Sequence, residues 1–230
     1  MSTVPAHSQP HPHRIALPPA ILGVPSRWVA ACAAAEAVGM TAAALASRVG
    51  THVPPAAGLA LVVAGGLVEG TALGTAQGVL LRRVLPRLRR GRYVAATVLV
   101  AGLGWAAASA PAVLSGDDEG ATPPLLLVLL GAAGLGLVMG AVLGVAQSWA
   151  LRGAAPHPWR WTTANAAAWP GAMAVIFAGA TLPDAGWRLD AVLGVALVTG
   201  ASAGALLGVV TGRFLPAVTG IAKAPVDVVG

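Results

Sequence analysis

Long apolar stretches separated by short clusters of charged residues are the main feature of this chain. Six of the stretches are long enough to cross roughly 30 Å of hydrocarbon at about 1.5 Å per residue. They cover residues 28–47, 56–81, 93–114, 124–151, 161–182 and 190–212. The pattern therefore predicts an all-α integral membrane protein with six transmembrane helices.

The composition agrees with this prediction. Of the 230 residues, 57% are hydrophobic and 10% are charged, and the mean hydropathy is +0.78. A water-soluble domain of this size needs a charged surface that the chain does not have. The first stretch is the least apolar, because it is mostly Ala with Glu36 in its middle, and we expect it to lie inside the bundle.

The basic residues predict the orientation of the helices. Twelve of the 14 Lys and Arg residues fall on one side of the predicted membrane, and only Arg48 and Arg188 fall on the other. Because positively charged loops stay in the cytoplasm, both termini are predicted to be cytoplasmic and the acidic loop 117–119 external. The pI near 11.3 then follows from topology and does not indicate nucleic-acid binding.

The chain divides into three predicted parts. Residues 1–26 lack the apolar core of a signal peptide and are expected to form a disordered cytoplasmic tail. Residues 27–214 form the transmembrane domain, and residues 215–230 form a second cytoplasmic tail. Three tail histidines, His7, His11 and His13, are weak metal ligands at most, because no cysteine or fixed geometry accompanies them. We predict no metal site and no cofactor.

An internal repeat is visible in the second, fourth and sixth stretches. They read LVEGTALGTAQGVLLRR from Leu67, LVMGAVLGVAQSWALRG from Leu137 and LVTGASAGALLGVVTGR from Leu197. Each repeat is a two-helix hairpin, and the three repeats cover 27–83, 92–153 and 160–213. Since each contains an even number of spans, the repeats are parallel, and we expect a pseudo-threefold arrangement about the membrane normal.

Glycines recur every four residues in these three helices. Four-residue spacing places them on one helical face, where missing side chains let helix backbones approach closely. We therefore predict a helix-packing role for them, while a face that lines a pore or holds a lipid tail stays open as an alternative. The set includes Gly70, Gly74, Gly140, Gly144, Gly200, Gly204 and Gly208.

Two resemblances follow from the repeats. The three-hairpin plan resembles that of the mitochondrial carriers, but their charged signature on the odd helices is absent, so their transport cycle is not implied. The pattern Gly-x-x-x-Gly-x-x-Gln, at 70–77 and 140–147, with a following Leu-Arg, is similar to that of uncharacterised multi-pass membrane proteins of GC-rich bacteria. This resemblance implies a bacterial plasma membrane and no particular activity.

Glu36 and Glu69 are the strongest functional candidates. Each lies near the middle of a predicted span, about 14 Å and about 20 Å from the nearest arginine at about 1.5 Å per residue. An ionised carboxylate there costs at least about 2.5–3.5 kcal/mol. No predicted span contains Lys or Arg to neutralise it. Each carboxyl group must be protonated, hydrated in a cavity or bound to a cation, and all three states suit the handling of a proton or ion. The alternative is a protonated Glu that is hydrogen-bonded to a neighbouring backbone or hydroxyl group and serves only in helix packing.

Polar and aromatic side chains complete the candidate site. Gln77, Gln147 and Asn165 lie about one turn from the cytoplasmic helix ends, and we expect either a polar ring below the carboxyl groups or hydrogen bonds between helices. Trp105 and Trp169 lie deeper and either form the wall of a cavity for an apolar or cationic ligand or belong to the core. The remaining tryptophans are predicted interfacial anchors: Trp28, Trp149, Trp159, Trp161 and Trp187.

A run of arginines between the first two repeats predicts contact with the inner membrane surface. Its side chains are suited to anionic lipid headgroups, and a protein partner or a second copy of the chain is the alternative. The run comprises Arg82, Arg83, Arg87, Arg89, Arg90 and Arg92.

Catalytic motifs of soluble enzymes are absent from the sequence. We find no nucleophile with a neighbouring base, no phosphate-binding loop and no His-Glu-x-x-His pair, and we assign no catalytic residue. The leading hypothesis is a small transporter or channel-like protein in which Glu36 and Glu69 handle a proton, cation or small solute. A non-catalytic subunit of a larger membrane complex and an intramembrane lipid-modifying enzyme are the alternatives.

Overall fold

The computed structural model describes residues 24–114, 123–184 and 186–220. Residues 1–23 of the predicted N-terminal tail, with the three histidines, lie outside the described residues. So do the acidic loop 117–119 and the last ten residues, which include Lys223. The structure therefore bears on the predicted transmembrane domain and its short loops.

The described part of the chain is all helical and contains no strand, as the hydropathy pattern predicts. Five of the helices are long and apolar enough to cross a membrane. The exception is α5, whose 21 residues include Thr162, Asn165 and Pro170 among its apolar side chains. The helices are α1 (Val24–Gly50), α2 (Pro55–Val84), α3 (Arg90–Leu114), α4 (Leu125–Leu151), α5 (Arg160–Ala180) and α6 (Leu189–Thr219).

The end of α6 differs from the sequence prediction. Residues 215–219, which we assigned to a cytoplasmic tail, continue the helix to Thr219. Leu215 and Val218 are buried against the bundle, so the apolar face of α6 extends beyond Arg213. The helix ends where Gly220 adopts a φ of +72°, a left-handed conformation that favours glycine at a helix C-terminus.

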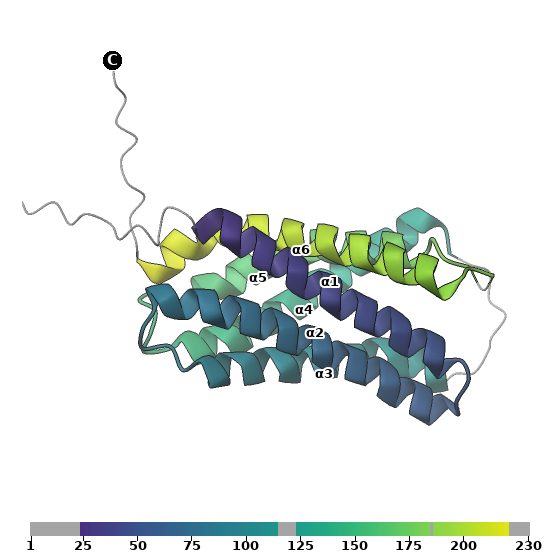
Figure 1. Ribbon diagram of the computed structural model, residues 1–230. Helices are drawn as coiled ribbons and strands as arrows, with labels where there is room; N and C mark the ends of the chain where they lie inside the picture. Colours follow the sequence, from purple (N-terminus) through teal and green to yellow (C-terminus); the bar gives the residue numbers. More distant parts are fainter. Residues whose placement is uncertain (1–23, 115–122, 185, 221–230) are drawn as a thin grey trace, which may run out of the picture.

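The six helices form an elongated antiparallel bundle (Figure 1). Each helix packs against its neighbours in the chain, and α6 returns to pack extensively against α1. Among these neighbouring pairs, α3 and α4 contact each other least. The start of α1 and the end of α6 lie at the same end of the bundle, where α2 ends and α3 begins. We call this the arginine end, because it carries Arg82 to Arg92.

The predicted packing glycines face the following helix around the bundle. A Cβ atom on Gly70 would lie 2.9 Å from a backbone atom of α3, and one on Gly144 would lie 2.6 Å from a backbone atom of α5. One on Gly208 would lie 2.7 Å from a backbone atom of α1. Helices α2, α4 and α6 therefore pack so closely against α3, α5 and α1 that backbone faces backbone at these glycines. The same partner helices face Gly74, Gly140, Gly200 and Gly204.

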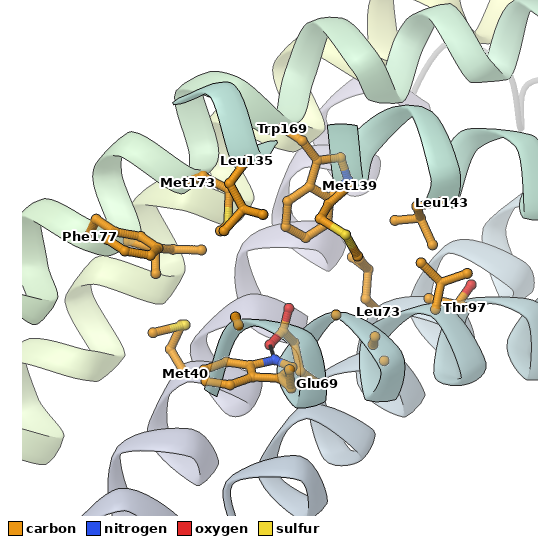
Figure 2. A pocket seen from close by; sticks show the side chains of 17 residues that line it. Met40, Glu69, Leu73, Thr97, Leu135, Met139, Leu143, Trp169, Met173 and Phe177 are labelled. Carbon is orange, nitrogen blue, oxygen red and sulfur yellow. Dashed lines mark hydrogen bonds between the residues drawn. The ribbon is translucent and has the colours of Figure 1, made fainter. Parts of the chain in front are cut away.

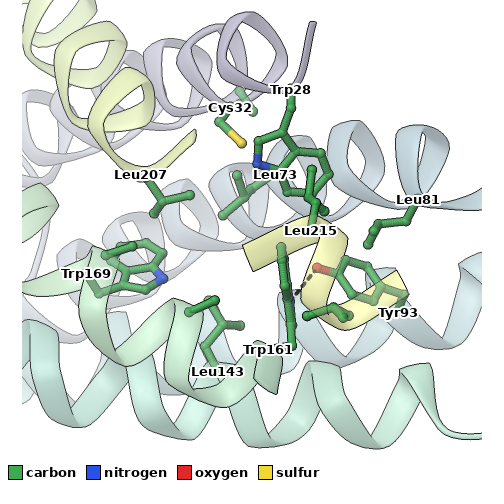
Figure 3. Close-up of a cluster of buried hydrophobic side chains, with 14 of the residues drawn as sticks. Trp28, Cys32, Leu73, Leu81, Tyr93, Leu143, Trp161, Trp169, Leu207 and Leu215 are labelled. Atoms are coloured by element: carbon green, nitrogen blue, oxygen red, sulfur yellow. Dashed lines mark hydrogen bonds between the residues drawn. The ribbon is translucent and has the colours of Figure 1, made fainter. Parts of the chain in front are cut away.

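Two tryptophans predicted as interfacial anchors are core residues instead. Trp28 and Trp161 are fully buried, and their rings meet edge to face with centroids 5.6 Å apart (Figure 3). Trp28 Nε1 also donates a hydrogen bond to Thr211 Oγ1 at 2.9 Å. The anchor prediction was wrong here, because position near a helix end does not say which way the side chain points. The other predicted anchors are exposed: Trp149, Trp159 and Trp187.

Candidate binding site

An apolar cavity of about 150 Å³ lies inside the bundle, and Figure 2 shows its lining. Helices α2, α3, α4 and α5 form most of the wall, and α1 contributes Met40. Long flexible or aromatic side chains dominate the lining, among them Leu73, Met139, Met173 and Phe177. Methionine fills irregular space without strong shape preference, so this wall can adapt to different apolar contents.

The cavity reaches the outside of the bundle where α3 meets α4. Its lining includes Ala108, which is exposed, and Trp105 and Met139, which are half-buried. These two helices also share the smallest contact in the bundle. The gap between α3 and α4 therefore gives the cavity a lateral opening on the apolar outer surface.

Glu69 is the one acidic side chain in the cavity wall. It lies midway along α2 and is 6% exposed, and its Oε2 accepts a hydrogen bond of 2.7 Å from Trp105 Nε1. Figure 2 shows one carboxyl oxygen at this bond and the other directed toward the cavity. Across from it, a Cβ on Gly39 of α1 would lie 2.6 Å from Glu69 Cβ, so a glycine makes room for the carboxylic side chain.

Glu36 lies outside the cavity lining and is nearly isolated. Its side chain is 1% exposed, and neither carboxyl oxygen has a hydrogen-bond partner in the described part of the protein. It precedes Gly39 by one helical turn, so both acidic side chains lie at the contact of α1 with α2, where their charges would repel each other. The structure thus brings together the two carboxyl groups that the sequence singled out.

Neither carboxyl group has a basic partner. Among the described residues, the one salt bridge joins Arg188 to Asp190 at an exposed site near the start of α6. Over residues 24–114, 123–184 and 186–220, the arginines lie near helix ends or in loops. No group of three or more His, Cys, Asp or Glu side chains in these ranges could hold a metal ion.

The three amide side chains predicted for the site meet in one hydrogen-bonded cluster. Gln147 Nε2 donates to Thr97 Oγ1 at 2.9 Å and to Gln77 Oε1 at 3.3 Å. Asn165 Nδ2 donates to Gln147 Oε1 at 3.3 Å. All four side chains are at most 1% exposed. Of the two roles left open by the sequence, hydrogen bonding between helices is the one that these contacts show.

Two aromatic residues that the sequence did not assign to the site complete this amide cluster. Trp161 Nε1 donates to Gln147 Oε1 at 2.8 Å and to Tyr93 OH at 3.1 Å, and Tyr93 OH donates to Gln77 Oε1 at 2.9 Å. A signal was present, because Trp28, Tyr93 and Trp161 occupy the same position at the start of the three odd-numbered stretches. An aromatic residue with one polar atom at the start of each predicted repeat points to an internal hydrogen bond.

The amide cluster and the cavity share a boundary. Trp169, a predicted site residue, lines the cavity with its ring and donates from Nε1 to Asn165 Oδ1 at 3.3 Å. Thr97 likewise lines the cavity and accepts a hydrogen bond from Gln147. On α2, Leu73 stands one turn from both Glu69 and Gln77, so apolar side chains separate the carboxyl group from the amides.

The arginine end presents an exposed basic surface. All six arginines predicted to meet lipid headgroups are exposed there, in the last turn of α2, the short loop and the first turn of α3. Nearby, the Arg152 guanidinium stacks over Trp149 and Trp159, 4.7 Å and 5.2 Å from the ring centroids. The six are Arg82, Arg83, Arg87, Arg89, Arg90 and Arg92.

Comparison with known proteins gives no independent guide to function. No protein-family model matches the chain, and no curated protein or solved structure is significantly similar to it. The site therefore has to be interpreted from its own chemistry.

Proposed function

We propose that this protein is a small transporter or channel-like protein of the bacterial plasma membrane that handles a proton, cation or small solute through Glu36 and Glu69. The observation that carries the proposal is a pair of buried carboxyl groups without basic partners in the middle of two apolar helices. One has no hydrogen bond in the described residues, and the other faces a cavity.

Energetics favour a functional origin for these acids. An ionised carboxylate in a membrane helix costs at least about 2.5–3.5 kcal/mol, and an unpaired buried polar group adds its own penalty. Glu36 makes no hydrogen bond that offsets this free-energy cost, because its carboxyl oxygens have no partner in the described part of the chain. Carboxyl groups with this environment are typical of proton relays and ion sites in membrane proteins.

The same proposal includes six spans around a pseudo-threefold axis, with both termini in the cytoplasm. Its support is that the glycines of α2, α4 and α6 face α3, α5 and α1 in turn, so that each hairpin meets the next one in the same way. The 21 residues of α5 reach about 31 Å at about 1.5 Å per residue, enough to cross the bilayer core. Asn165, the amide side chain of α5, is buried inside the bundle.

Infrared difference spectroscopy of the reconstituted protein tests the role of the acids. The carboxyl bands are followed across pH in the parent protein, in Glu36→Gln and in Glu69→Gln. A band that titrates near neutral pH and disappears in one variant shows an exchangeable site, as transport requires. Carboxyl bands that stay unchanged at every pH would show that both acids serve only in helix packing, and this result would overturn the proposal.

A role as a non-catalytic subunit is the second candidate, and the exposed arginines favour it. Six basic side chains gathered at one end of the bundle suit an acidic partner surface as well as anionic lipid. The glycine faces are occupied within the chain, so a partner would use other surfaces. Purification in mild detergent decides: this role requires a stoichiometric partner that is lost when Arg87 and Arg89 are both changed to Gln.

A further inference from the structure

The size of the cavity limits what it can hold. Its volume of about 150 Å³ matches that of an engineered apolar cavity that binds benzene. Beside Glu69 and Thr97, the walls consist of apolar and aromatic side chains and two glycines. A ligand about as large as one aromatic ring, and largely apolar, fits this volume and this wall.

The carboxyl group of Glu69 gives the cavity a preference that a neutral ligand does not meet. Oε2 accepts one hydrogen bond from an indole N–H, and the other oxygen faces the cavity. No Lys, Arg or His lines the cavity. When Glu69 is ionised, its carboxylate in such a low-dielectric place needs a positive charge close by. Since the lining residues supply none, a cation inside the cavity is the group that stabilises the ionised form.

The wall favours an organic cation over a metal ion. Ca²⁺ takes 6–8 oxygen ligands and Mg²⁺ six, whereas the cavity lining offers the Glu69 carboxyl and the Thr97 hydroxyl. Aromatic faces bind ammonium groups instead, and Trp105, Trp169 and Phe177 all line the cavity. An ammonium ion with apolar substituents satisfies the carboxylate and the apolar wall together.

From these observations we propose that the cavity binds a small lipophilic organic cation, with Glu69 as its counter-charge and the gap between α3 and α4 as its route from the bilayer. The inference rests on the proposed function, because it takes Glu69 as an ion-binding carboxylate, and it names the class of substrate. Exposed Ala108 and half-buried Met139 mark the mouth on the two helices that contact each other least.

Equilibrium dialysis of the purified full-length protein in detergent tests this inference. The probe is phenyltrimethylammonium, which carries a fixed charge, and its neutral counterpart of the same shape is tert-butylbenzene. We expect saturable binding of about one cation per chain, at least tenfold weaker in Glu69→Gln. Asp190→Asn is the matched control, because it removes an exposed carboxylate that does not line the cavity and should leave binding unchanged.

A second variant keeps the test decisive if Glu69→Gln folds poorly. Ala108→Phe places a ring at the mouth, on an exposed position where extra volume does not disturb the core. It should weaken binding of the cation and of tert-butylbenzene alike. Equal affinity of the parent protein for both probes, or full cation affinity in Glu69→Gln, would overturn the inference and leave a cavity for a neutral apolar group such as a lipid tail.

Failure of this inference can be separated from failure of the proposed function. Binding is measured in detergent, while flux of the cation or of protons is measured in sealed proteoliposomes. Saturable, Glu69-dependent binding without any flux would uphold the cation site and count against transport. Proton flux that depends on Glu36 and Glu69, without cation binding, would uphold the transporter and overturn the site.

Discussion

At the residue scale, the buried polar side chains fall into two classes. Gln77, Gln147 and Asn165 belong to a cluster in which every amide has a hydrogen-bond partner. Glu36 has none in the described residues, and Glu69 has one indole N–H. Satisfied polar groups fix the packing of helices, whereas unsatisfied ones destabilise it. The two classes therefore predict opposite effects of substitution.

Glu36→Met should increase stability. The substitution removes a buried carboxyl group without hydrogen bonds and replaces it with an apolar side chain of similar length. We expect a gain of about 1–3 kcal/mol, visible as a higher midpoint of thermal unfolding in detergent. Glu69→Met, which loses the bond to Trp105, should gain less. A lower midpoint for Glu36→Met would show that its carboxyl group does stabilise the fold.

Gln147→Leu should decrease stability. Gln147 bonds to Gln77, Thr97, Trp161 and Asn165, and Leu can replace none of these contacts. We expect a loss of about 1–2 kcal/mol in the same unfolding measurement, in line with hydrogen bonds between membrane helices.

The matched control for Gln147→Leu lies on the same helix. Val145 is 44% exposed, so Val145→Ala should leave the unfolding midpoint nearly unchanged. If Gln147→Leu unfolded at the same temperature as this control, the amide cluster would not contribute to stability.

At the element scale, glycines set the distance between helices, because they have no side chain to hold the two backbones apart. The close approach of α6 to α1 depends on glycines, because a Cβ on Gly204 would lie 2.8 Å from Ala33 Cα. In lipid the hydrophobic effect does not drive helices together, so backbone-to-backbone packing carries much of the association energy. The four-residue spacing predicted this face from sequence, but the partner helix became known only from the structure.

Gly204→Ala should separate α6 from α1. We expect a loss of about 1–3 kcal/mol, because the added methyl group overpacks a contact between two backbones. Gly194→Ala on the same helix is the control, since nothing lies within 4 Å of its added Cβ, and it should stabilise α6 slightly. Thermal unfolding of both variants in detergent measures the difference, and equal midpoints would contradict the close-packing role.

At the scale of the whole molecule, the bundle closes on itself by the contact between α6 and α1. The weaker contact between α3 and α4 leaves the lateral opening of the cavity. Successive helices begin alternately at the arginine end and at the opposite end. This alternation determines which helix ends share a side of the membrane if all six helices cross it.

Cysteine labelling in intact cells should confirm this topology. Thr51→Cys and Thr181→Cys place exposed thiols at the end opposite the arginines and should react with a membrane-impermeant maleimide. Arg87→Cys and His157→Cys should react only after permeabilisation. The parent protein is the control, because its one cysteine, Cys32, is buried. Labelling of Thr181→Cys and His157→Cys from the same side would show that α5 does not cross.

The sequence by itself determined the properties that depend on local patterns. Apolar stretches of sufficient length predicted the helices, and a lone acid in such a stretch marked Glu36 and Glu69 as candidates, because an acid in an apolar span is recognisable from the surrounding sequence alone. Only the tertiary structure decided which helices meet and which way each side chain points. It therefore decided that Trp28 and Trp161 are buried, that the amides satisfy one another, and that Glu69 faces a cavity while Glu36 does not. These properties arise from contacts between residues far apart in the chain, and the matching positions of Trp28, Tyr93 and Trp161 were the one sequence signal that pointed to any of them.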